Sequence, residues 1–257
     1  MLSADDRTFR HEYKYLVSAA QIPVLRSRIT GLMRPDTNTG EDGMYHIRSV
    51  YFDDWQDRCF HDNETGVDGK AKYRIRIYNA SDARIRLELK EGRRGKKHKT
   101  SDLLTREQAD QLISGAYLRG ISAPSAADTA RTGIAQMSHA SDSYRVLPGL
   151  CADIMTNRMR PVVIVEYDRV PYVYRYGNVR VTFDLNISSS RDFGHFFCSS
   201  IRRRPIMPAG MHLMEVKFDD FLPDTIYRAL QLEQLRQTTF SKYYLCRIYS
   251  TKEVLWR

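Results

Sequence analysis

The sequence has little cysteine, and no cysteine pair has a spacing typical of a disulfide framework or a metal site. Four cysteines occur, none of them in a CxxC pair: Cys59, Cys151, Cys198 and Cys246. Widely spaced cysteines are typical of a reduced cytosolic protein in which the thiols are inert. The seven histidines are also dispersed, with none at metal-ligand spacing from another, so we expect structural roles for them.

Long apolar runs and common nucleotide-binding motifs are also missing. No run approaches the roughly 18 residues of a membrane-spanning helix, and the N-terminal residues lack the basic-then-apolar form of a signal peptide. The sequence contains no GxxxxGK(S/T), no GxGxxG after an expected strand and no HExxH, which argues against P-loop, Rossmann and zincin enzymes. We expect a soluble, cytoplasmic protein without a membrane segment.

Positive charge is concentrated in one stretch of the chain. The net charge is +9 over 257 residues. Between Lys70 and Lys99 there are twelve Lys or Arg and three Asp or Glu, so this stretch alone accounts for the excess. A localised cationic patch indicates an anionic partner, such as nucleic acid, lipid head groups or a phosphate-rich small molecule.

Two runs inside this stretch alternate strictly between charged and apolar residues. In the first, Lys70, Lys72, Arg74 and Arg76 alternate with Ala71, Tyr73, Ile75 and Ile77. In the second, Arg84, Arg86, Glu88 and Lys90 alternate with Ile85, Leu87 and Leu89. Because side chains alternate across a strand, each run predicts a strand with one charged face. Turn-forming residues at 79–82 join the two strands in a hairpin.

Strands outnumber helices in the rest of the chain. Further strands are predicted at residues 8–17, 45–53, 161–174, 178–185 and 211–218. Helices are expected at 18–33, 55–64, 105–115 and 224–235, the first and third of them opened by capping boxes. The basic residues 93–100 are expected to form a loop that enters another strand. This pattern predicts an α+β fold in which an antiparallel sheet or barrel carries helices packed outside it.

The whole chain, residues 1–257, is expected to form a single domain. No repeat at a solenoid period and no convincing linker divides it. Residues 121–143, which are rich in Ala, Ser and Thr, are interpreted as an insertion within this domain. Residues 191–210 are interpreted as a long mobile loop.

The charged faces of the expected strands favour a common anionic ligand over plain solvation. A solvated sheet face normally mixes charges of both signs, whereas here cations recur on several strands and arginine dominates. If the sheet closes, these faces converge on a cationic lumen that a polyphosphate would satisfy. The isolated acids Glu12, Glu88 and Glu215 could then hold a divalent cation that bridges phosphate oxygens.

Tyrosines near the basic residues raise the alternative of single-stranded nucleic-acid binding by base stacking. Tyr13, Tyr15 and Tyr73 alternate with basic residues, however, and so lie on the opposite faces of their strands. Core packing is the better interpretation of these rings, and no nucleic-acid partner is expected.

Eight short motifs occur in an order that resembles a known family. They are EYKY (12–15), RSVYFD (48–53), RIR (74–76), ELK (88–90), EYDR (166–169), VRVTFD (179–184), MEVK (214–217) and FSKY (240–243). In these motifs the chain resembles the catalytic domain of the vacuolar transporter chaperone (VTC) polyphosphate polymerases, within the CYTH-like triphosphate tunnel metalloenzymes. The resemblance runs over residues 7–249 and implies an antiparallel β-barrel that forms a triphosphate tunnel.

The resemblance also implies roles for individual residues. The catalytic phosphate ligands on the tunnel wall would be Lys14, Arg74, Arg76, Lys90, Arg169, Arg180 and Lys242. Further contacts to the substrate are expected from Arg48, Lys72, Arg86, Lys97, Tyr167 and Ser241. Glu215 resembles the metal-binding carboxylate, and Glu12 and Glu88 are expected to join it in holding Mn²⁺ or Mg²⁺.

The reaction implied by the resemblance is transfer of the γ-phosphoryl group of ATP onto inorganic polyphosphate. Such transfer needs alignment and neutralisation of spread negative charge more than covalent chemistry. Two alternatives stay open in the same tunnel: hydrolysis of tripolyphosphate or a nucleoside triphosphate, and non-catalytic binding of polyphosphate. Arg10 stands where the wider superfamily has its first glutamate, and Thr239 where the polymerases have a lysine. Arg10 in place of a glutamate counts against the binding of two metal ions by the strand expected at residues 8–17.

Overall fold

The computed structural model describes residues 10–67, 69–93, 96–116 and 146–251, without the side chains of residues 93, 96, 97 and 251. The insertion expected at 121–143 lies outside these residues.

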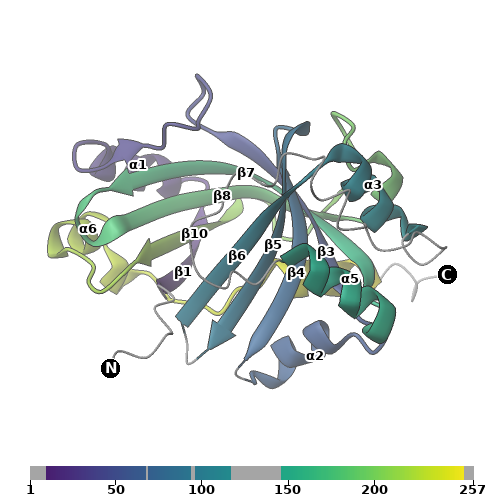
Figure 1. The fold of residues 1–257 in the computed structure, drawn as a ribbon. Helices are drawn as coiled ribbons and strands as arrows, with labels where there is room; N and C mark the ends of the chain where they lie inside the picture. Colours follow the sequence, from purple (N-terminus) through teal and green to yellow (C-terminus); the bar gives the residue numbers. More distant parts are fainter. Residues whose placement is uncertain (1–9, 68, 94–95, 117–145, 252–257) are drawn as a thin grey trace, which may run out of the picture.

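The described strands belong to one antiparallel sheet (Figure 1). Its order is β1-β10-β8-β7-β3-β4-β5-β6, with β2 added to β7 and β9 added to β8. The strands are β1 (His11–Ser18), β2 (Arg34–Pro35), β3 (Tyr45–Asp53), β4 (Lys70–Tyr78), β5 (Ser81–Arg93), β6 (Lys96–Leu104), β7 (Arg160–Tyr174), β8 (Val179–Ser190), β9 (Arg204–Pro205) and β10 (Met211–Phe218).

Short helices lie between and after the strands. They are α1 (Gln21–Thr30), α2 (Arg58–Thr65), α3 (Arg106–Ser114), α5 (Val146–Asn157), α6 (Asp224–Ala229) and α7 (Lys242–Thr251). Three 3₁₀ turns accompany them: η3 (Tyr176–Asn178), η4 (Phe193–His195) and η5 (Leu232–Gln234). None of the helices in the described residues has the length and apolar character needed to cross a bilayer.

The sheet curls until its two edge strands, β1 and β6, lie in contact (Figure 1). Within the described residues no hydrogen-bonded ladder joins these two strands, so the barrel is left unsealed along one seam. The predicted α+β architecture, an antiparallel barrel-like tunnel fold with helices packed outside, is confirmed, with the exception of α7. The curl gives the sheet a convex face and a concave face.

Apolar residues on the convex face hold the outer helices. Helices α1 and α6 cover β1, β10 and β8, where Ile29 and Phe183 are fully buried. Helices α3 and α5 cover the strands from β3 to β6, where Ile75 and Leu150 are fully buried. Because each such side chain contributes about 1.5–3 kcal/mol when it leaves water, these two clusters stabilise the curvature of the sheet.

Helix α7 lies on the concave side of the sheet and fills part of the barrel interior. Its Tyr243 and Cys246 are buried there. The Tyr243 hydroxyl donates a hydrogen bond to Asp53 at the end of β3. The Asp53 carboxylate also accepts the backbone N–H groups of Cys59 (2.9 Å) and Phe60 (3.2 Å) in α2. One buried carboxylate therefore fixes α2 and α7 against the same strand.

Local sequence signals place several elements correctly. The β4–β5 hairpin turns at Asn79 and Ala80, whose φ values of 52° and 53° suit the type I′ turn that twisted strands favour. Helix α3 begins with the expected capping box between Thr105 and Gln108. The loop expected at 93–100 is wrong from Lys96 on, because β6 pairs with β5 from there. Its backbone hydrogen bonds outweigh the low strand preference of its basic residues.

Candidate anion-binding site in the barrel interior

The concave face of the sheet encloses a pocket of about 200 Å³, which we call the central pocket. Strands β1, β4, β5, β7 and β10 line it together with β3 and the start of α7. Eleven of the sixteen residues expected to act on a substrate or a metal border it: Glu12, Lys14, Lys72, Arg74, Arg76, Lys90, Tyr167, Arg169, Glu215, Ser241 and Lys242. Nine of them meet because strand alternation directs them to the concave side, and Ser241 and Lys242 reach the pocket from the start of α7.

Positive charge dominates the wall of the central pocket. Among the described residues, nine lysine or arginine side chains and three glutamates line it. Like charges held together in a partly enclosed space raise the free energy of the empty protein, since water screens them less than at an open surface. The pocket is therefore electrostatically suited to an anion that carries several charges.

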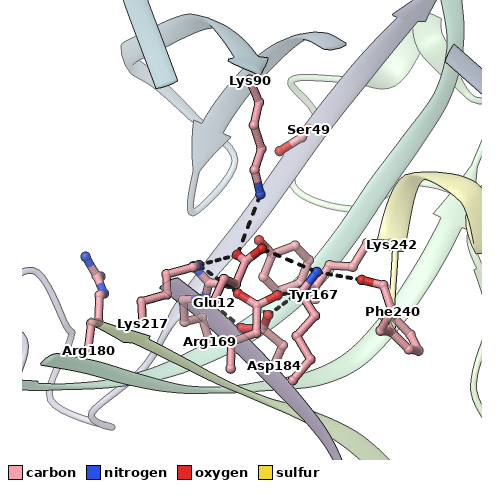
Figure 2. A network of polar contacts seen from close by, with 12 residues as sticks. Glu12, Ser49, Lys90, Tyr167, Arg169, Arg180, Asp184, Lys217, Phe240 and Lys242 are labelled. Atoms are coloured by element: carbon pink, nitrogen blue, oxygen red, sulfur yellow. Dashed lines mark hydrogen bonds and ion pairs between the residues drawn. The ribbon is translucent and has the colours of Figure 1, made fainter. Parts of the chain in front are cut away.

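Glu12 lies among three lysines that come from three strands (Figure 2). Its carboxylate is 3.2 Å from the Nζ of Lys217 and 3.6 Å from the Nζ atoms of both Lys14 and Lys90. Burial alone would raise the pKa of Glu12, but the surrounding lysines hold it well below its ordinary value. Glu12 is thus a fixed negative charge on the edge strand β1.

Glu215 forms a second anionic centre beside Glu12. Its carboxylate is 2.6 Å from the Nζ of Lys242, 2.8 Å from the Nζ of Lys217 and 3.4 Å from the Arg169 guanidinium. Burial would raise the pKa of Glu215, but these cations keep it well below its ordinary value. Lys217 contacts both glutamates, and its own pKa is raised because their charges outweigh its burial.

Asp184, which the sequence analysis did not select, completes this network on β8 (Figure 2). Its carboxylate accepts two hydrogen bonds from Arg169, at 2.6 and 2.8 Å, and lies 2.6 Å from the Nζ of Lys242. The bidentate pair fixes the plane of the Arg169 guanidinium. A signal was present, since Asp184 shares the strand face of Arg180. Lys217 likewise shares the face of Glu215 and was not chosen as a ligand.

Arg74 and Arg76 on β4 face the same pocket from the opposite side. Arg74 pairs with Glu88 at 2.5 Å and donates to the Tyr51 hydroxyl at 2.9 Å. Arg76 donates to the Ser49 hydroxyl at 3.1 Å and to the Tyr167 hydroxyl at 3.4 Å. The hydrogen bonds of Arg76 thus go to neutral hydroxyl groups, while the charge of the buried Glu88 acts on its guanidinium without an ion pair.

Lys90 is the cation whose charge depends most on its surroundings. Glu12 favours its protonated form, but burial and the neighbouring charges of Lys14, Lys217 and Arg74 outweigh that effect and lower the pKa of Lys90 to about 7. An additional anion in the pocket would raise this pKa again. The protonation of Lys90 is therefore linked to occupancy of the pocket.

Four of the expected residues do not line the central pocket, and the side chain of a fifth, Lys97, lies outside the described part of the chain. Arg48 is fully buried on the convex side, where it donates to the carbonyl oxygens of Phe196 (2.8 Å) and Cys198 (2.6 Å). Arg180 points away from the glutamates (Figure 2) and pairs with Asp36 at 2.7 Å. The other two are Glu88, which is buried beneath Arg74, and Arg86, which lies opposite Arg76 in the β4–β5 ladder.

The pocket carboxylates fit a divalent cation only in part. No group of three or more His, Cys, Asp or Glu side chains in the described part of the chain is placed to hold a metal ion. Mg²⁺ and similar ions, however, are commonly held by one or two carboxylates together with substrate phosphates. Glu12 and Glu215 border the pocket and fit that arrangement. Glu88 does not, because it is fully buried and is not among the residues that line the pocket.

Comparison with known families gives one clear match. The model of the VTC domain family matches residues 9–249. No curated protein matches the sequence.

Among solved structures, a candidate adenylate cyclase from Bacillus halodurans is 14% identical with a TM-score of 0.47, over 90% of this chain and 95% of that one. A candidate adenylyl cyclase from Hippeastrum, described as having a dominant triphosphatase activity, is 13% identical with a TM-score of 0.49, over 93% of this chain and 94% of that one. The PH1819 protein from Pyrococcus horikoshii is 12% identical with a TM-score of 0.43, over 92% of this chain and 97% of that one.

Proposed function

The chain belongs to the VTC domain family, and from that premise we propose that it is a polyphosphate-forming phosphotransferase. It would move the γ-phosphoryl group of ATP onto inorganic polyphosphate inside the barrel, with Mn²⁺ or Mg²⁺. The observation that carries this proposal is the central pocket, whose nine cations and three glutamates come from segments distant in sequence.

The lysines of the pocket are positioned before a substrate arrives. Lys14 donates to the carbonyl oxygen of Phe240 at 2.6 Å, and Lys217 and Lys242 are held by Glu215. Charged donors that are already fixed need little reorganisation when a phosphate chain replaces some of their present contacts. Lys14, Lys217 and Lys242 would thus neutralise one side of the chain.

Arg74 and Arg76 would contact the phosphates from the β4 side. Arg76 is held by two hydroxyl groups, from Ser49 and Tyr167, and these leave part of its guanidinium free for phosphate oxygens. Cations on two facing walls restrict how a linear phosphate chain can lie. Such alignment is the main contribution that a protein makes to phosphoryl transfer.

Glu12 and Glu215 are the residues that would hold a divalent cation. When bound, such an ion would withdraw charge from phosphate oxygens and so assist departure of the leaving group. The same carboxylates keep the lysines in place when no substrate is present. The two roles are compatible, because an entering phosphate chain supplies the negative charge that the lysines would lose.

The proposal is tested by incubating the purified protein with ATP and Mn²⁺ and separating the products by chain length on a gel. Long-chain polyphosphate together with ADP is the expected result. Free phosphate without chain growth would instead indicate a hydrolase of the same substrates. Binding of polyphosphate without turnover under any divalent metal would indicate a binding module, and either outcome would overturn the polymerase proposal.

Two variants make the assay specific to the central pocket. Arg76→Ala removes a cation that forms hydrogen bonds to hydroxyl groups and no ion pair within the described residues, so product formation is expected to fall at least tenfold while the fold persists. Arg175→Ser removes an equal charge from an exposed position outside the pocket and is expected to retain wild-type product formation. Equal losses in both variants would show that the pocket is not where the reaction occurs.

A further inference from the structure

A second cavity, larger than the central pocket, lies at the far end of β8. Its volume is about 570 Å³, and four arginines border it: Arg191, Arg202, Arg203 and Arg204. We call it the arginine pocket. It shares no lining residue with the central pocket, and none of its residues was assigned a role in phosphoryl transfer.

The segment that carries these arginines is fixed to the sheet at both ends. At its start, the Ser190 hydroxyl accepts the backbone N–H of Asp192 at 3.0 Å. At its end, β9 pairs with Ser188 and Ser189 of β8. Between them, Phe196 is buried against the convex face. The arginines are therefore held on an ordered frame.

Arg48 of β3 also holds the segment that carries these arginines. Its guanidinium donates to the carbonyl oxygens of Phe196 and Cys198 within the segment, at 2.8 and 2.6 Å. A buried arginine that is used to hold a loop backbone fixes the shape of that loop. This placement gives Arg48 a structural role for the arginine pocket in place of a contact in the central one.

The charges of the arginine pocket are poorly balanced. Asp192 is its one carboxylate among the described lining residues, and it already binds the Nδ1 of His195 at 2.6 Å. Arg203 pairs with Glu166 at 3.1 Å. Within the described part of the chain, no ion pair or side-chain hydrogen bond engages the guanidinium of Arg191 or of Arg202. Both guanidinium groups are exposed at the cavity. The charge of Arg202, after the hydrogen bond from His195, helps to lower the pKa of Asp192, so one carboxylate stands against four arginines among the described lining residues.

The shape and chemistry of the cavity indicate its ligand. Arginine binds phosphate oxygens in a forked geometry, and four arginines around a cavity of this volume exceed what one phosphate group requires. Nucleic acid is disfavoured, because stacking needs open aromatic faces. The aromatic side chain in the lining, Tyr249, already lies beside the Arg204 guanidinium at 5.7 Å. An inorganic phosphate chain supplies several charges without bases.

We propose that the arginine pocket is a second anion site, which binds an inorganic oligophosphate chain outside the barrel. Arg191 and Arg202 would form the primary contacts, and Arg203 and Arg204 would border the site. The proposal rests on the proposed function for the identity of the chain as inorganic polyphosphate. Its test measures binding alone and does not require turnover.

The experiment is calorimetric titration with tripolyphosphate in buffer that contains EDTA. Wild-type protein is expected to bind two molecules, and the double variant Arg191→Ser/Arg202→Ser to bind one. Arg76→Ala, which weakens the central pocket, is expected to retain the site that the double variant loses. The control Arg175→Ser/Arg236→Ser removes the same charge from two exposed positions outside both pockets and is expected to bind two.

A second measurement includes a wild-type arm that does not depend on how the variants fold. Hydrogen–deuterium exchange of wild-type protein should show tripolyphosphate-dependent protection of residues 191–205, and Arg191→Ser/Arg202→Ser should abolish that protection. Unchanged stoichiometry in the double variant, or equal loss in the control, would overturn the proposal. So would a single-stranded oligonucleotide that binds as tightly as tripolyphosphate and is lost in the same variant.

The two proposals fail in distinguishable ways. If no polyphosphate is formed from ATP but Arg191→Ser/Arg202→Ser still loses one bound tripolyphosphate, the arginine pocket stands and the polymerase activity does not. If polyphosphate is formed but the double variant binds tripolyphosphate as the wild type does, the polymerase activity stands and the arginine pocket does not. Neither result depends on the other assay.

Discussion

At the scale of single residues, Arg74 and Arg76 differ in the kind of partner that they meet. Arg74 pairs with Glu88, a fully buried carboxylate whose second ion-pair partner is Lys99 at 2.9 Å and whose charge Arg76 also stabilises. Arg76 meets two hydroxyl groups. Glu88 would by burial have a raised pKa, but Arg74 and its neighbours lower it below the ordinary value. Removal of Arg74 therefore affects stability as well as ligand binding, whereas removal of Arg76 affects mainly binding.

A double-mutant cycle tests this difference. Arg74→Ala is expected to lower the free energy of unfolding by about 3 kcal/mol, the low end for a buried pair that loses one partner, because Lys99 remains. Adding Glu88→Gln should restore at least about 1 kcal/mol, since the unpaired charge disappears. Tripolyphosphate affinity should be at least tenfold weaker than that of the wild type in Arg74→Ala and in the double variant. Urea unfolding and calorimetry measure these quantities, and additive stability losses in the cycle would contradict the pairing.

His46 offers a pH-dependent contribution to stability on the convex face. Its Nδ1 lies 2.9 Å from Asp168 and its Nε2 lies 2.7 Å from Glu166. Both nitrogens can donate only when the ring is protonated. Burial lowers the pKa of His46, but the two carboxylates outweigh it and raise the pKa above the ordinary value. Arg48 and Arg203, which also contact Glu166, limit the size of that rise.

The sign of the resulting pH effect follows from linkage. A raised folded-state pKa stabilises the protein fully below the unfolded value of about 6.5, and this contribution is lost as pH rises through the folded-state pKa. The difference in free energy of unfolding between wild type and His46→Gln should therefore shrink as pH rises from 6. Urea unfolding across that range measures it. A difference independent of pH would count against the prediction, and His61→Gln on α2 serves as the matched control.

At the scale of elements, alternation was the signal that could be read from the sequence, and it worked where one strand face is polar. On β4 it separated Arg74 and Arg76 from the buried Ile75 and Ile77. On β3 it could not decide, because Arg48 on the convex side alternates with Ile47 on the concave side, and both are fully buried. When both faces of a strand are buried, alternation alone does not show which face a charged residue lies on.

The second element that the sequence could not predict is β6, and its pairing with β5 explains why. β6 is rich in lysine and follows a glycine, which is typical of a loop. It becomes a strand because β5 offers an open edge from Ile85 to Arg93. That edge exists only once the β4–β5 hairpin has formed, so the information lies in tertiary context.

Helix α3 provides an element-scale prediction that separates fold from function. Thr105 accepts the N–H of Gln108 and the Gln108 side chain accepts the N–H of Thr105, at 3.2 and 3.0 Å. Thr105→Ala is expected to lower the free energy of unfolding by about 1 kcal/mol. Since α3 packs on the convex face, tripolyphosphate affinity should be unchanged. A loss of affinity, read by calorimetry, would show that α3 influences the pocket, while Thr105→Ser should behave as the wild type.

At the scale of the whole molecule, an ion pair and side-chain contacts bridge the barrel seam that backbone hydrogen bonds leave open. Glu12 on the edge strand β1 lies 3.6 Å from Lys90 of β5, across the seam from its own ladder partner Lys217. The sequence could indicate that both residues face one lumen. It could not indicate that one carboxylate neutralises cations on both sides of an unsealed barrel, because that depends on how far the sheet curls.

Glu12→Gln tests whether this carboxylate balances the empty pocket. Without its charge, Lys14, Lys90 and Lys217 repel one another, so the melting temperature in EDTA should fall by several degrees, as for a loss of about 1–2 kcal/mol. Tripolyphosphate replaces the missing charge, so the rise in melting temperature that it causes should exceed that of the wild type. Glu233→Gln, at an exposed position on η5, should change neither value. A smaller ligand-induced rise in Glu12→Gln would contradict the prediction and would mean that Glu12 aids phosphate binding by holding the lysines in position.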